Sequence, residues 1–144
     1  MHTTTDYLAE INREIDMRRQ VYPGRVSLKK MSQAAADKKI ELMRQIGVIF
    51  HIAETLHLHP QDLKLPLYEP HGSPYPITTL EPHIKEAEQE IGWREHMLTK
   101  TNLGSATKRT KTEQLEIMRE MLQHLRAIQD KETPAKPLTQ TSLF

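Results

Sequence analysis

The chain has 144 residues, the length of one ordinary domain, and its 20 basic and 19 acidic side chains leave a net charge of +1. This balance excludes a histone-like polycation, so any binding of nucleic acid would depend on local basic patches. The absence of cysteine excludes disulfides, thiolate metal sites and cysteine nucleophiles. No apolar run reaches the roughly 18 residues of a membrane span, and the first residues do not resemble a signal peptide. We therefore expect a cytoplasmic protein of a bacterial host cell, without membrane contact.

The first helix is predicted over residues 6–21, where apolar residues recur at helical spacing with charged residues between them. Thr3 with Asp6 fits a capping pair at its start. We expect Tyr22-Pro23-Gly24 to end this helix, because proline lacks the backbone N–H and glycine tolerates a turn.

A second helix is predicted from Ser32, an effective N-cap, to residue 58, and Pro60 closes it. The two helices predict an antiparallel hairpin over residues 1–58. Residues 59–77 then contain five of the nine prolines, interleaved with leucines and tyrosines. We interpret this segment as an extended connector that lies over the helices, with a peptide-binding role as the alternative.

Residues 78–131 are expected to form a second helical hairpin. Its first helix is predicted to begin at a Thr78–Glu81 capping box, to include Trp93 in its apolar stripe and to stop near residue 103. Its second helix is expected to begin near residue 107, or at a further capping box formed by Thr110 and Glu113, and to end near residue 130.

The two predicted hairpins repeat each other. An offset of 76 residues aligns Glu14 and Arg18 with Glu90 and Arg94. An offset of 75 aligns the second helix of each hairpin and repeats Glu-x-Met-Arg, with Glu41, Met43 and Arg44 falling on Glu116, Met118 and Arg119. We interpret the repeat as an internal duplication, although amphipathic helices also converge on similar patterns. The predicted fold is all-α, with two hairpins whose apolar faces cover each other.

The first hairpin also resembles a known module. Its residues Arg18-Arg19-x-Val21-Tyr22-Pro23-x-x-Val26 are followed by Met31-Ser32-x-x-x-Ala36 and by Ile40-x-x-Met43-x-x-Ile46. This pattern, over about residues 7–55, resembles a short module found in small phage and prophage proteins. The resemblance implies an origin in a mobile element and leaves the activity unassigned.

Residues 132–144 are predicted to be a flexible tail with a docking peptide. The tail contains Gln140, Thr141, Ser142, Leu143 and Phe144, which resemble the peptides that bind the bacterial DNA sliding clamp. Those peptides have the form Gln-Leu-Ser/Asp-Leu-Phe, so only Thr141 departs from the pattern. The resemblance implies that Leu143 and Phe144 enter a hydrophobic cleft of the clamp while Gln140 forms a hydrogen bond at its edge.

Basic residues gather near both predicted hairpin turns, where they could contact phosphates or an acidic protein partner. A solvated surface without a partner is an equally simple interpretation. The candidates are Arg18, Arg19, Arg25, Lys29 and Lys30 near the first turn, and Lys108, Arg109 and Lys111 near the second.

Enzymatic interpretations have less support. Glu54-x-x-His57 has the spacing of a di-iron ligand pair, but such a site needs a second motif of the same kind. Glu113 and Glu116 weakly resemble helical nucleotide pyrophosphatases, which require another acidic pair. We therefore expect no catalytic residues, no metal and no cofactor.

The sequence as a whole predicts a non-enzymatic, phage-derived protein that binds the sliding clamp and either recruits a second protein to the replication machinery or inhibits it. One alternative is a DNA-binding phage accessory protein that uses the basic turns. Another is a host-takeover inhibitor that binds some other bacterial protein through its helical body. A homo-oligomer in which hairpins are exchanged between copies is also open.

Overall fold

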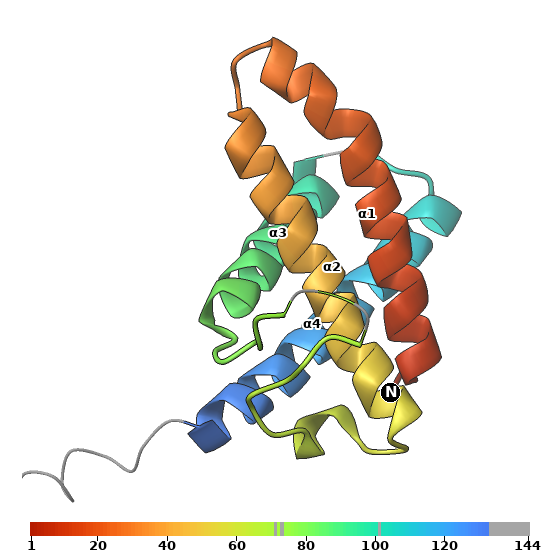
Figure 1. The fold of residues 1–144 in the computed structure, drawn as a ribbon. Coiled ribbons are helices and arrows are strands. Elements are labelled where there is room, and N and C mark those ends of the chain that lie inside the picture. The colour runs from red at the N-terminus through yellow and green to blue at the C-terminus, as the bar shows by residue number, and fades with distance from the viewer. Residues whose placement is uncertain (71, 73, 101, 133–144) are drawn as a thin grey trace, which may run out of the picture.

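The computed structural model describes residues 1–70, 72, 74–100 and 102–132, which form an all-α fold. Its helices pair as predicted, and Figure 1 shows the first hairpin laid across the second. None of the described helices combines the length and the apolar character needed to cross a membrane. The elements are α1 (Thr4–Ser27), α2 (Gln33–Thr55), the short 3₁₀ helix η1 (Pro60–Asp62), α3 (Glu81–Lys100) and α4 (Ser105–Glu132).

Helix α1 continues past the predicted stop at Tyr22-Pro23-Gly24, so that prediction is wrong. Gly24 does not adopt a left-handed conformation, and its carbonyl oxygen accepts a hydrogen bond from the Leu28 N–H. The left-handed residue is Lys29, with a φ of 57°. The Lys30 N–H then bonds the Arg25 carbonyl at 2.9 Å, which closes a Schellman motif. Tyr22 is buried, so the extra turn contributes to packing.

Two of the four predicted caps are confirmed. Thr3 and Asp6 form a reciprocal capping box, and the Ser32 hydroxyl accepts a hydrogen bond from the Ala35 N–H at 3.0 Å. The Thr78 box is wrong, because α3 begins at Glu81, whose N–H bonds the neighbouring Thr79 hydroxyl. The Thr110 box is also wrong, because Thr110 lies inside α4 and its hydroxyl donates to the Ala106 carbonyl.

The connector packs into the same core as both hairpins. Leu63, Leu65 and Leu67 are at most 8% exposed, and Leu67 exchanges two backbone hydrogen bonds with Ile77. The side chain of Lys131 on α4 donates to the Gln61 and Leu63 carbonyl oxygens. The rest of the core is mainly aliphatic and methionine-based, including Ile46, Ile49, Phe50, Met118, Met121, Leu125 and Ile128.

Candidate functional site

The most unusual feature of the described interior is a network of arginines and glutamates between α1 and α3. Arg18 and Glu14 are each 1% exposed, and Glu90 is 8% exposed. The Arg18 guanidinium donates to Glu14 at 2.7 Å, to Glu90 at 3.1 Å and to Glu86 at 2.9 Å. It also donates to the Lys39 carbonyl oxygen at 2.9 Å, so the side chain holds α1, α2 and α3 together.

Arg94 repeats these contacts from the other hairpin. Its guanidinium lies 2.8 Å from Glu90 on its own helix, and 2.8 Å from both Glu14 and Glu10 on α1. It donates to the Gln114 carbonyl oxygen at 3.1 Å. Each hydrogen-bond or ion-pair partner of Arg18 therefore has a counterpart around Arg94, at a sequence offset of 76 for the first helix of each hairpin and 75 for the second. The network has the approximate two-fold symmetry that an internal duplication would give.

The charges inside the network are balanced. Burial alone would lower the pKa of Arg18, but its hydrogen bond to Glu14 and the neighbouring carboxylates raise that pKa above its ordinary value. The pKa of Arg94 is raised against burial in the same way by Glu90, Glu10 and Glu14. Arg13 and Lys39 pair with the two outer glutamates, Glu10 and Glu86. The four carboxylates thus face guanidinium and ammonium groups.

A second symmetric pair of contacts lies farther along the same helices. The Tyr7 hydroxyl donates to Glu120 at 3.1 Å, and at the equivalent place His83 Nε2 lies 2.7 Å from Gln45 Oε1. Burial, reinforced by the charge of nearby Lys38, lowers the pKa of His83 to about 4. His83 is therefore neutral at physiological pH. These polar pairs extend the cross-hairpin contacts beyond the arginine network.

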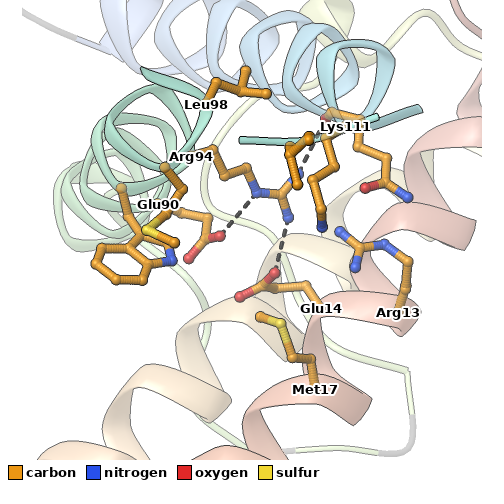
Figure 2. Close-up of a pocket in the computed structure, with 11 residues that line it drawn as sticks. Arg13, Glu14, Met17, Glu90, Arg94, Leu98 and Lys111 are labelled. Carbon is orange, nitrogen blue, oxygen red and sulfur yellow. Dashed lines mark hydrogen bonds and ion pairs between the residues drawn. The ribbon is translucent and has the colours of Figure 1, made fainter. Parts of the chain in front are cut away.

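Two pockets flank the network where it approaches the surface. The first, of about 210 Å³, lies between α1, α3 and the start of α4, and includes Trp93, Leu98 and Leu103. Figure 2 shows Arg94 on one side of it, bonded to Glu14 and Glu90, with Arg13 and Lys111 pointing toward the same space. The second pocket, of about 350 Å³, includes Tyr22 and Arg25. Both pockets are lined by Glu14, Met17, Glu90 and Trp93.

The structure separates the predicted basic residues into different environments. Arg18 belongs to the buried network, so the expectation that it contacts a nucleic acid or an acidic partner is wrong. Its helical position, four residues after Glu14 and facing α3, explains the burial. Arg25 is half-buried, with its guanidinium 5.8 Å from the centre of the Trp93 ring. The exposed candidates are Arg19, Lys29, Lys30, Lys108, Arg109 and Lys111.

The candidate clamp-binding residues Gln140, Thr141, Ser142, Leu143 and Phe144 lie outside the described residues. Within the described ranges, no group of three or more histidine, aspartate or glutamate side chains is arranged to hold a metal ion. His57 of the weak di-iron motif has a φ of 54° and occupies the left-handed position that ends α2. That geometry explains the residue as part of a helix terminus.

Two features of the site were missed by the sequence prediction. The repeated Glu and Arg pairs were recognised only as evidence of duplication. That they would face one another across the two hairpins and form a buried ion network was not predicted. Trp93 was assigned to the apolar stripe of its helix but is 48% exposed. Its position gave a usable signal: it lies two residues after Ile91, which places it on roughly the opposite side of a helix with 3.6 residues per turn.

No protein-family model matches the chain, and no curated protein or solved structure matches it either.

Proposed function

We propose that this chain is a non-enzymatic, phage-derived docking protein that binds the bacterial DNA sliding clamp through Gln140-Thr141-Ser142-Leu143-Phe144. The observation that carries the proposal is the match of four of these five residues to clamp-binding peptides. Adjacent Leu143 and Phe144 supply the two apolar anchors, and few anchors account for most of the affinity in such contacts. In cells, the bound protein recruits a second protein to the replication machinery or blocks access to the clamp.

The helical body supports a scaffold role in this proposal. Its buried carboxylates, Glu14 and Glu90 foremost, are bonded to arginines and so serve the packing of one hairpin on the other. The ordinary use of buried carboxylates in catalysis or metal binding requires a free oxygen facing substrate or ion. Here both oxygens of Glu14 and both oxygens of Glu90 accept hydrogen bonds from Arg18 or Arg94.

The clamp proposal is tested with the full chain and purified bacterial clamp in a surface-binding assay. We expect Leu143→Ala together with Phe144→Ala to weaken binding by about tenfold or more. Leu138→Ala is the matched control, an apolar truncation outside the pentapeptide. Undiminished affinity of the double variant would overturn the proposal. Competition with a polymerase-derived clamp peptide then distinguishes binding in the cleft from binding elsewhere on the clamp.

The alternative function, DNA binding, is favoured by the exposure of Lys29 and Lys30 at one turn and of Lys108 and Arg109 near the other. Its test is fluorescence anisotropy with duplex DNA over a range of salt concentrations. Affinity that falls steeply with salt, and that disappears when these four residues are changed to glutamine, would support this function. Salt-independent or absent binding would exclude it.

A further inference from the structure

The surface above the arginine network contains an unusual concentration of apolar side chains. Met17 and Val21 of α1 are 37% and 42% exposed, while Trp93 and Met97 of α3 are 48% and 36% exposed. Met17 and Trp93 line both pockets, so the two hollows adjoin at these side chains. We call this feature the Trp93 groove, defined by the two pockets that Met17 and Trp93 share. Contiguous exposed apolar surface around hollows is typical of a binding site.

The charges in the groove differ between its floor and its rim. The carboxylates in its floor, Glu14, Glu86 and Glu90, are buried and already bonded to Arg18, Arg94 or Lys39. They therefore present little negative charge to a partner. Along the groove, the charged side chains that reach solvent from its rim are cationic: Arg13, Arg25, Lys39 and Lys111.

One end of the groove is notably short of anions. Lys111 is exposed, and within the described part of the chain its ammonium group has no hydrogen bond or ion pair. Arg13 shares the first pocket with it, and the only carboxylate bonded to Arg13 among the described residues is the buried Glu10. Two cations that converge on one apolar hollow favour an anionic group in the occupant.

We propose that the Trp93 groove binds an acidic segment of a partner protein, with two bulky apolar side chains that enter the two pockets. Trp93 lies between the pockets and forms the anchor, since an exposed tryptophan with arginine beside it is typical of binding hot spots. The methionines allow the pocket walls to adapt to different side chains. Acidic side chains of the segment pair with Lys111 and Arg13 at one end and with Arg25 at the other.

A peptide fits this groove better than a nucleic acid does. Single-stranded nucleic acids bind on successive aromatic platforms along a basic track. Here one exposed aromatic ring, Trp93, lies between two hollows, of which the first is lined by Leu98 and Leu103 and the second by Val21 and the buried Tyr22. Apolar hollows of this kind accept protruding side chains. The inference does not depend on the clamp peptide, because Trp93 lies on α3 and residues 140–144 follow α4 in the sequence. If the clamp proposal also holds, the Trp93 groove is the second binding surface that a recruiter needs.

The test uses a random peptide library displayed on phage, selected on the purified full chain. Trp93 is the only tryptophan, so its fluorescence reports occupation of the groove by each synthetic peptide that emerges. We expect the selected peptides to contain acidic residues and two bulky apolar residues. Trp93→Ala, followed by calorimetry, should weaken their binding by about tenfold or more, and Lys111→Glu should weaken it by several-fold.

The matched controls are Tyr68→Ala, which removes an exposed aromatic ring from the connector, and Lys64→Glu, which reverses an exposed charge there. Both should leave peptide affinity unchanged, and circular dichroism should show all four variants folded. Failure to select binders, a neutral or basic consensus, or binding that survives Trp93→Ala would overturn the proposal.

Three further measurements identify other occupants, and each positive result would also overturn the proposal. Trp93-dependent binding of a single-stranded oligothymidylate would assign the groove to nucleic acid. A concentration-dependent dimer that Trp93→Ala abolishes would assign it to a second copy of the chain. A shift in Trp93 emission on deletion of residues 140–144 would assign it to the chain's own tail. Clamp binding by Trp93→Ala should remain intact, so failure here is distinguishable from failure of the clamp proposal.

Discussion

Arg18 and Arg94 hold the same position in the two hairpins, and each binds the glutamate that precedes the other. Glu90 accepts from both guanidinium groups, and so does Glu14. The pairing of the hairpins therefore depends on complementary charges as well as on apolar packing. Buried ion pairs contribute little net stability compared with an apolar core, but breaking one leaves an uncompensated charge.

We expect Arg18→Met and Arg94→Met each to lower the free energy of unfolding by about 3–5 kcal/mol, because buried glutamates lose their counter-charge. The two losses should not add, since both arginines share Glu14 and Glu90. Urea unfolding of the single and double variants measures this coupling. Arg126→Met is the control: its pair with Glu88 is half-exposed and should contribute at most about 1 kcal/mol. Additive losses would contradict a shared network.

Acidification should destabilise the fold through His83. Its pKa is lowered from 6.5 to about 4 in the folded state, so the unfolded chain binds more protons between these values. The free energy of unfolding should therefore fall as the pH drops from 6.5 to 4, by roughly 3 kcal/mol in total. His83→Gln should reduce this slope when urea unfolding is repeated across the range. The exposed His51→Gln is the control, and equal slopes in the two variants would refute the assignment.

Lys29→Gly should stabilise the protein. Lys29 adopts a φ of 57°, which costs a residue with a Cβ about 1–2 kcal/mol and costs glycine little. Glycine also increases the entropy of the unfolded chain, which leaves a net gain of about 0.5–1 kcal/mol. Thermal unfolding followed by circular dichroism measures the gain. Lys30→Gly is the control: Lys30 does not have a positive φ, so glycine there only increases the entropy of the unfolded chain and should leave stability unchanged or lower it.

Thr3 caps a helix in the structure, whereas Thr110 fits a capping pattern in the sequence but lies inside a helix, so the same substitution at the two positions should have different effects. Thr3→Ala should cost about 1 kcal/mol, because the Asp6 N–H loses its acceptor at the start of α1. Thr110→Ala should change stability by less than about 0.5 kcal/mol, because Thr110 is exposed inside α4 and alanine favours helix. Chemical denaturation of both variants under one condition provides the comparison, and a comparable loss at Thr110 would contradict the observed start of α4.

The helices and their pairing could be predicted because apolar residues recur every three or four positions and local caps such as Ser32 mark their starts. The predicted helix ends were wrong where two local sequence signals disagree. Thr110 and Glu113 fit a capping box, yet the same spacing is compatible with a helix interior. Pro23 removes only one backbone donor, and the burial of Tyr22 favours continuing the helix.

The site was harder to predict because its contacts are far apart in the sequence. Arg18 lies 72 residues from Glu90, and a basic side chain beside a helical turn looks the same in sequence whether it is buried or exposed. The duplication contained the missing information. Glutamates and arginines that recur in both hairpins at the same helical spacing are expected to face one another once the hairpins pack symmetrically.

The connector has a consequence for how the molecule comes apart. Leu65 and Leu67 lie in one continuous core with Ile49 of the first hairpin and Leu125 of the second. Removing either hairpin would expose the connector's leucines and take from the remaining arginine the carboxylates that it binds on the facing hairpin. We therefore expect the two halves to open together. Amide hydrogen exchange should show similar protection in the middle of α2 and of α4, the behaviour of one cooperative unit.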